Sequence, residues 1–162
     1  MTADAAWREL ATNLADCLGA LEEDEFLIIS QKHANVFVQF AGQGWYGLRA
    51  EAVCNSFIQP PTALLTEAQY AAMDALGWHR ATNSEPDPAV SGDVDGSPNF
   101  FVDVPRDAEL APVAEMAVRT LHEVNGVGHP GMLEYAAFHE DGTSIRFPTL
   151  RILRHRPESP VE

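Results

Sequence analysis

Residues 25–55 read EFLIISQKHANVFVQFAGQGWYGLRAEAVCN and contain three strand-like stretches in quick succession. The first, Glu25–Gln31, has a continuous apolar run, which is typical of a central strand that is covered on both faces. The second stretch is Asn35–Ala41, and a glycine-containing turn leads from it into the third, Trp45–Asn55. Because connections this short join antiparallel neighbours, these residues predict an antiparallel meander.

Three helices are predicted around this meander. Apolar residues at helical spacing predict one amphipathic helix over Ala3–Leu21 and another over Leu110–Asn125. Between them, Thr66 and Gln69 form a capping box at the start of a helix that runs to Leu76. The remaining strand-like stretches are Asn99–Val104, Leu133–His139 and Ser144–Phe147. This order predicts an α+β fold, in which helices pack on an antiparallel sheet of about five to six strands.

The charge of the chain excludes two classes of partner. The sequence has 162 residues, with 24 Asp or Glu and 10 Lys or Arg, which gives a formal net charge of −14. Such a charge repels phosphate backbones and anionic lipid headgroups, so we expect neither nucleic acid nor a membrane surface as partner. Cys17 and Cys54 are two isolated thiols rather than a disulfide framework, which favours a reducing, cytoplasmic location.

The length fits a single domain, which we expect to span residues 1–156, followed by a flexible tail at residues 157–162. The stretch Arg80–Pro98 is rich in Pro, Gly, Ser, Asn and Asp. A loop of this length is usually functional or disordered, and we interpret it as a mobile excursion from the fold.

The sequence lacks the familiar motifs of catalysis. It has no Gly-x-Ser-x-Gly elbow, no phosphate-binding loop, no His-Glu-x-x-His and no Cys-x-x-Cys. Its 6 histidines are scattered without the spacing of metal ligands. We therefore predict no enzyme activity, no cofactor and no metal site.

One group of polar residues remains, on the third strand-like stretch. Side chains two positions apart share a face of a strand, so Arg49, Glu51 and Asn55 line one side. Trp45 lies on the same side. These residues could form a cross-strand ion pair, with the asparagine capping the strand end. Alternatively, they could line a polar, aromatic-edged groove that takes the backbone or side chains of a partner.

The chain resembles actinobacterial proteins of the TY-Chap group, which joins type III secretion (Tir-type) chaperones to YbjN-like proteins. The resemblance covers most of residues 5–150. It rests on the first helix and on six further stretches: residues 36–41 (VFVQFA), 48–55 (LRAEAVCN), 65–78 with its Leu-Gly-Trp end, 98–100 (PNF), 133–138 (LEYAAF) and 147–150 (FPTL). It implies an α+β fold of helices on an antiparallel sheet, and a non-enzymatic, protein-binding role, often as a homodimer.

Our first hypothesis is therefore a chaperone or adaptor that binds an unidentified polypeptide partner through its sheet. The partner would contact Trp45, Arg49, Glu51 and Asn55. A homodimer would use Tyr70 and Met73 of the second helix and Phe101 of the strand at Asn99–Val104. The alternatives are a small-molecule sensor or an unrecognised enzyme, with a pocket around Trp45, Arg49 and Glu51, or an immunity-type protein that blocks one specific toxin.

Overall fold

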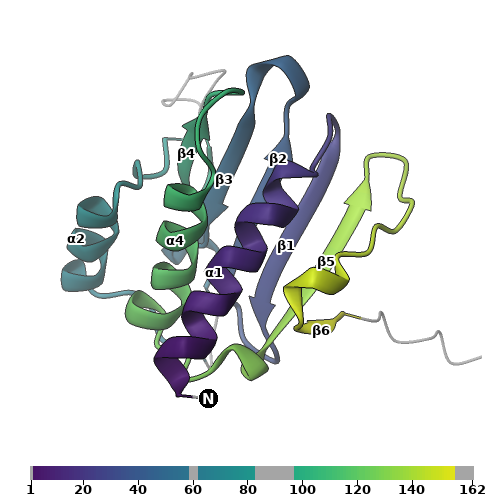
Figure 1. Cartoon of the computed structure of the whole chain (residues 1–162). Coiled ribbons are helices and arrows are strands. Elements are labelled where there is room, and N and C mark those ends of the chain that lie inside the picture. The colour runs from purple at the N-terminus through teal and green to yellow at the C-terminus, as the bar shows by residue number, and fades with distance from the viewer. Residues whose placement is uncertain (1, 59–61, 83–96, 156–162) are drawn as a thin grey trace, which may run out of the picture.

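The computed structural model describes residues 2–58, 62–82 and 97–155 (Figure 1). In these ranges the α-helices are α1 (Ala3–Gly19), α2 (Glu67–Leu76) and α4 (Ala111–Arg119). The strands are β1 (Glu25–Gln31), β2 (Phe37–Gly42), β3 (Leu48–Ala52), β4 (Phe100–Val104), β5 (Leu133–His139) and β6 (Leu153–Arg154). Most of the expected loop at residues 80–98, from 83 to 96, and the expected tail at residues 157–162 lie outside the described residues.

The strands form one six-stranded sheet in the order β4-β3-β2-β1-β5-β6. The meander of β1, β2 and β3 is antiparallel, as predicted, and β1 also pairs antiparallel with β5. β4 pairs antiparallel with β3, whereas β6 runs parallel to β5. The sheet is therefore mixed but mostly antiparallel, and the α+β fold class is confirmed.

α1 and α4 lie side by side on one face of the sheet (Figure 1). α1 begins where the Thr2 hydroxyl accepts a hydrogen bond from the Ala5 amide at 3.2 Å. Its inner stripe joins one hydrophobic core with the side chains of β1 and β2 that point towards the helices. The buried side chains of this stripe are Trp7, Leu10, Leu14, Cys17 and Leu18. The stripe predicted from the sequence is thus the face that α1 buries.

α2 lies beside β4, at one edge of the sheet (Figure 1). The capping box at Thr66 and Gln69 is formed, and Gly77 ends the helix in the left-handed conformation at φ 113°. The next residue, Trp78, is buried, and its indole N–H donates to the Thr120 hydroxyl at 2.8 Å. This bond ties the end of α2 to the helical segment that follows α4.

The predicted start of the third strand differs from the structure because of two glycines. β3 begins at Leu48 rather than at Trp45, and residues Gly44–Tyr46 form a 3-10 turn. Gly44 and Gly47 have φ of 57° and 96°, values that favour glycine. A Cβ on Gly47 would lie 2.0 Å from the Val104 carbonyl oxygen, so the turn packs tightly against the end of β4.

The predicted strand at Ser144–Phe147 is wrong. Ser144 makes a single bridge to Phe138, and the Ile145 amide still donates to the Ala137 carbonyl at 2.8 Å before the chain leaves the sheet. Phe147 is buried, its amide donates to the Tyr135 hydroxyl at 3.0 Å, and a 3-10 turn follows at Pro148–Leu150. Because proline has no amide hydrogen, this turn cannot extend a ladder. The sixth strand is instead the two-residue β6.

The helix predicted over Leu110–Asn125 is divided. α4 ends at Arg119, and residues Thr120–Val124 form a π-helical turn. The Thr120 hydroxyl donates to the Met116 carbonyl at 2.8 Å, and this local bond accompanies the change in winding.

Candidate functional site

The sheet face opposite α1 and α4 carries rows of side chains that cross the strands in register, among them Glu134, Ser30 and Phe37, and two of these rows run from β5 to β4. We call this surface the open face. From β5 to β4, the first row is Phe138, Phe26, Ala41, Arg49 and Asp103. In the same order, the second row is Ala136, Ile28, Gln39, Glu51 and Phe101. Both rows are apolar on β5 and β1 and mostly polar on β3 and β4.

The apolar half of the open face is partly exposed. The rings of Phe26 and Phe138 lie with their centroids 5.5 Å apart, and Ile28 lies two residues further along β1. Phe26, Ile28 and Phe138 border a hollow of about 140 Å³ together with Gln39 and Glu51. The apolar run of β1 predicts that helices cover both faces of the strand, but among the described residues α1 and α4 both lie on the other face. The open face thus offers apolar surface to a partner.

The polar half of the open face is internally bonded. The Arg49 guanidinium donates to both carboxylate oxygens of Asp103, at 2.8 and 2.9 Å, and lies 4.9 Å from the centroid of the Phe101 ring. Glu51 accepts hydrogen bonds from the Gln39 amide, at 2.7 Å, and from the Ser97 hydroxyl. The cross-strand ion pair anticipated from the sequence is therefore present, and Arg49 and Glu51 do share a face.

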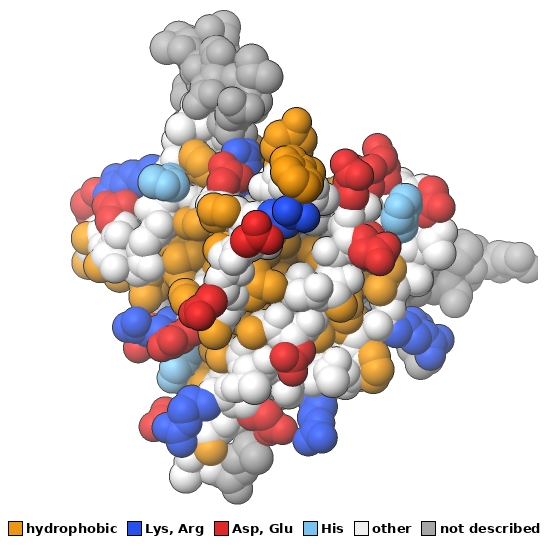
Figure 2. All heavy atoms as spheres, turned by 45° about the horizontal axis from the view of Figure 1, so that its top comes forward, with side chains coloured by type: hydrophobic (Ala, Val, Ile, Leu, Met, Phe, Trp, Pro, Cys, Tyr) orange, Lys and Arg blue, Asp and Glu red, His pale blue; other side chains and the backbone are white. Residues whose placement is uncertain are grey.

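The structure does not place Trp45 with Arg49 and Glu51. Trp45 lies in the turn before β3, is 73% exposed, and has the Arg106 guanidinium 3.9 Å above its ring centroid. Its neighbour Tyr46 is 81% exposed and borders a hollow with Arg49. Figure 2 turns this end of the molecule towards the viewer, where hydrophobic side chains protrude beside acidic and basic ones.

The hollow beside Tyr46 has a volume of about 620 Å³ and an acidic border. Glu23, Asp24 and Asp103 contribute its carboxylates, and Arg49 contributes its one guanidinium. The sequence does not predict that the acidic run after α1 lies beside the open face. Its place follows from the pairing of β1 with β2, which brings residues 23–24 next to Gly42–Gln43.

Asn55 has local contacts that hold the chain after β3. Its side chain accepts from the Leu65 amide at 2.7 Å and donates to the Leu65 carbonyl at 3.0 Å. Its own amide donates to the Tyr70 hydroxyl at 3.1 Å. Because β3 ends at Ala52, Asn55 does not continue the face of Arg49 and Glu51.

The residues predicted for a dimer have different environments. Met73 is 1% exposed and offers no surface to a second copy. Tyr70 is half-buried against Phe100, with ring centroids 4.9 Å apart. Phe101 is partly exposed on the open face and forms a backbone bridge to His79. Whether Tyr70 and Phe101 contact a second copy remains a prediction.

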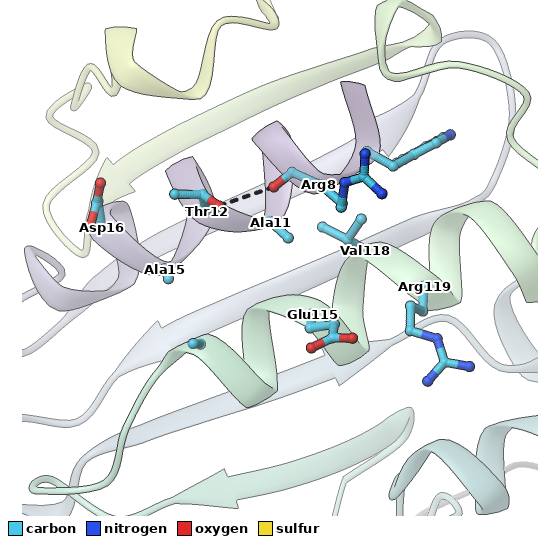
Figure 3. A pocket seen from close by; sticks show the side chains of 10 residues that line it. Arg8, Ala11, Thr12, Ala15, Asp16, Glu115, Val118 and Arg119 are labelled. Carbon is cyan, nitrogen blue, oxygen red and sulfur yellow. Dashed lines mark hydrogen bonds between the residues drawn. The ribbon is translucent and has the colours of Figure 1, made fainter. Parts of the chain in front are cut away.

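A second concave surface lies between α1 and α4, on the side of these helices that faces away from the sheet (Figure 3). This helix groove has a volume of about 490 Å³ and is mostly apolar. Ala11, Ala15 and Val118 form part of its wall, and Figure 3 shows Arg8 and Arg119 at one end and Asp16 at the other. The sequence did not predict this groove, because it depends on which helices become neighbours.

The cysteines and histidines show no sign of a reactive centre. Cys17 and Cys54 are free and buried, and burial raises the pKa of the Cys17 thiol, although a contact with Thr149 acts in the opposite direction. In the described ranges, no three metal-binding side chains come together. Within the same ranges, none of the helices combines the length and the apolar character that a membrane span needs.

Of three comparisons with known proteins, one found a match. A search of curated proteins and a search of solved structures each found no match. A family model does match, over residues 1–139, and it is described as T3SS (YopN, CesT) and YbjN peptide-binding chaperone 3. This match covers most of the 162 residues and agrees with the helices and sheet described above. The chain therefore belongs to the TY-Chap3 family of peptide-binding chaperones.

Proposed function

We propose that this domain holds an extended segment of a partner polypeptide on the open face of its sheet, without catalysis. The observation that carries the proposal is the apolar half of that face, where Phe26, Ile28 and Phe138 are partly exposed on the side opposite α1 and α4. An apolar surface of this kind, bordered by polar groups, is typical of a binding site for another chain. The free, buried cysteines favour the cytoplasm as the place of binding.

The charges of the open face favour a basic partner. Glu51 and Asp103 lie on its polar half, and Glu23 and Asp24 border the adjoining hollow. The whole molecule has a net charge of −14, which also attracts a basic segment and raises its rate of association. We therefore propose a segment that combines apolar side chains with lysine or arginine.

The width of the sheet sets the length of the segment. Six strands at a spacing of about 4.8 Å give a face about 24 Å wide. An extended chain covers this width with about seven residues at about 3.3 Å per residue. Apolar residues of the segment would contact β5 and β1, and its basic residues would reach β3 and β4.

The test is binding of a defined peptide, measured by fluorescence anisotropy. The probe is a fluorescein-labelled peptide of about twelve residues with leucines in one half and lysines in the other, long enough to cross the sheet. We expect it to bind, and we expect a leucine–glutamate peptide of equal length not to bind. Ile28→Asn should weaken binding about tenfold, because it removes apolar contact at the centre of the face.

Thr12→Asn is the matched control, since Thr12 is exposed on α1, on the other side of the molecule. It should leave the affinity unchanged. Equal binding of the two peptides would contradict the preference for a basic segment. Equal affinities of Ile28→Asn and Thr12→Asn would show that the segment binds somewhere else.

A further inference from the structure

The helix groove has charges of opposite sign at its two ends. Arg8 and Arg119 lie at one end and Asp16 lies at the other, while Glu115 borders the groove from α4 (Figure 3). Arg119 pairs with Glu123 at 2.7 Å. The other three side chains are exposed and take part in no ion pair within the described ranges. The groove is therefore complementary to a ligand with a negative group at one end and positive groups towards the other.

These side chains decide the potential along the groove, because the dipoles of its two helices oppose each other. Arg119 is the last residue of α4, whereas Arg8 lies in the second turn of α1, and the two lie at the same end. α1 and α4 are therefore antiparallel, and at each end the partial charges of one N-terminus and one C-terminus largely cancel. A ligand is thus oriented by the side chains at the ends of the groove.

A buried donor without an acceptor lies at the basic end. Trp7 borders the groove, is 4% exposed, and stacks on His122 with ring centroids 4.7 Å apart. Among the described residues its indole N–H has no hydrogen-bond partner. Most buried donors in proteins are paired, because an unmade hydrogen bond costs stability. Since Trp7 and Arg8 are neighbours on the groove side of α1, a carboxylate at this end can accept from both.

We propose that the helix groove binds an amphipathic α-helix of a partner protein, with acidic residues of that helix at the Arg8 end and basic residues near Asp16 and Glu115. Between the two ends, Ala11 and Ala15 give the groove a wall of small, partly exposed side chains. Larger side chains of a third helix, such as leucine, pack into a groove of this kind. Arg8 and Asp16 lie about 12 Å apart along α1, so a partner helix of about three turns reaches both.

The partner helix carries charges of both signs, so the net charge of −14 does not exclude it. Acidic residues in its N-terminal half and basic residues in its C-terminal half also stabilise the helix itself, through its dipole. Its N-terminus then lies at the Arg8 end, and the partner helix runs parallel to α1. This inference goes beyond the proposed function, because the groove and the open face lie on opposite sides of the sheet and one molecule can hold both ligands.

The test is binding of a designed helical peptide, measured by fluorescence anisotropy. The probe is fluorescein-labelled and has about eighteen residues, because shorter isolated helices are marginal in water. It carries leucine at every third or fourth position, glutamates in its N-terminal half, lysines in its C-terminal half and alanine elsewhere. We expect a dissociation constant in the range of about 1–100 µM. A peptide of the same composition without the leucine stripe should bind at least about tenfold more weakly.

Filling the groove should block the peptide. Ala11→Gln adds a longer side chain to the groove wall, and we expect it to weaken binding at least about tenfold. Ala75→Gln is the matched control, since Ala75 is an exposed helical alanine of α2, and it should leave the affinity unchanged. Glutamine is a good helix former, and circular dichroism checks that both variants are folded.

A double-mutant cycle tests the pairing at the basic end. Arg8→Gln in the chain, or glutamine in place of the glutamates in the peptide, should each weaken binding about threefold. The two changes together should cost no more than either one alone, because they remove the same contact. Arg146→Gln makes the same change of charge at an exposed site outside the groove, and it should not depend on the glutamates.

Nuclear magnetic resonance of the indole N–H groups reports on Trp7 directly. The chain has 3 tryptophans, and the Trp78 N–H already donates to Thr120. With ¹⁵N-labelled chain, the helical peptide should shift the Trp7 indole signal downfield, as expected for a new hydrogen bond. The signals of Trp45 and Trp78 should stay in place, since neither residue borders the groove.

Three results would overturn the proposal. The first is no binding of the helical peptide up to about 0.5 mM, well above the expected dissociation constant. The second is equal affinity of Ala11→Gln and Ala75→Gln. The third is loss of helical-peptide binding in Ile28→Asn, which would place the helix on the open face. Ile28→Asn should otherwise affect only the leucine–lysine peptide, so a failure of this inference and a failure of the proposed function give different results.

Discussion

The two faces of the sheet share their strands but differ in the side chains they present. On the helix-covered face, Leu27, Ile29 and Val38 are each 0% exposed and belong to one continuous core. On the open face, the residues that alternate with them along the strands, such as Ile28 and Gln39, are partly exposed. Because successive side chains of a strand point to opposite faces, one set stabilises the core and the other set is available to bind a partner. Substitutions on the covered face should change unfolding, and those on the open face should change binding.

The largest expected effect is on the covered side. Leu14 of α1 is 0% exposed, and Leu14→Ala should lower the free energy of unfolding by about 2–5 kcal/mol, because it leaves a cavity. Ile28→Ala on the open face should cost only about 1 kcal/mol, since that side chain is already partly in contact with water. Urea unfolding measures both values. Equal costs would mean that the two faces do not differ in burial.

A substitution of Asn55 distinguishes a residue that stabilises the fold from one that binds the partner. Asn55→Ala removes both hydrogen bonds to Leu65, which lie in a partly buried region, and should cost about 1–3 kcal/mol. Ser56→Ala is the matched control, because Ser56 is the exposed neighbour, and it should cost less than about 0.5 kcal/mol. Urea unfolding gives the stabilities and anisotropy gives the peptide affinity. A stable Asn55→Ala variant that fails to bind peptide would make Asn55 a recognition residue after all.

Arg49 lies on the open face and should contribute little to stability. The Arg49 side chain is 16% exposed but its partner Asp103 is 53% exposed, so solvent screens the pair from the Asp103 side, and Arg49→Ala should cost about 1 kcal/mol. The freed Asp103 carboxylate should bind the leucine–lysine peptide about twofold more tightly than in the wild type. Arg146→Ala makes the same change of charge at a distant exposed site. If Arg49→Ala abolishes binding while Arg146→Ala does not, the guanidinium itself contacts the segment.

Local signals in the sequence predicted much of the fold. The bounds of β1 and β5 agree with the predicted stretches, and the residue types at Thr66 and Gln69 predicted the capping box of α2. These features depend on neighbouring residues in the chain. β6 depends on where the chain returns after the Pro148 turn, and two residues carry no periodic pattern.

The site was harder to predict than the fold for the same reason. Alternation placed Arg49 and Glu51 on one face correctly, because both lie inside β3. It failed for Trp45, which precedes Gly47, and for Asn55, which follows the end of the strand, since alternation holds only within an extended strand. The helix groove requires that α1 and α4 be adjacent, which no single helix pattern contains. The apolar row of Phe26 and Phe138 likewise depends on the pairing of β1 with β5.

The smallest effect on stability is expected for a serine-to-cysteine substitution on the open face. The reactivity of its thiol can be compared directly with that of Cys17 on the covered side. Burial raises the pKa of the Cys17 thiol, so at pH values below that pKa it stays protonated, and its side of α1 is closed to solvent. Ser30→Cys places a thiol of nearly the same size on the open face, where Ser30 is partly exposed. With iodoacetamide at about pH 8, we expect the new thiol to react readily and Cys17 to react slowly. Mass spectrometry of the modified peptides gives both rates.

Labelling rates measured with and without the peptide show which face of the molecule the peptide covers. The leucine–lysine peptide should slow the labelling of the Ser30→Cys thiol, because the bound segment covers it, and should leave the slow rate of Cys17 unchanged. A chain that carries cysteine in place of exposed Thr12 is the control, since its thiol should label equally fast with and without peptide. Protection of that α1 thiol instead would place the segment in the helix groove, and the proposed roles of the two sides would be exchanged.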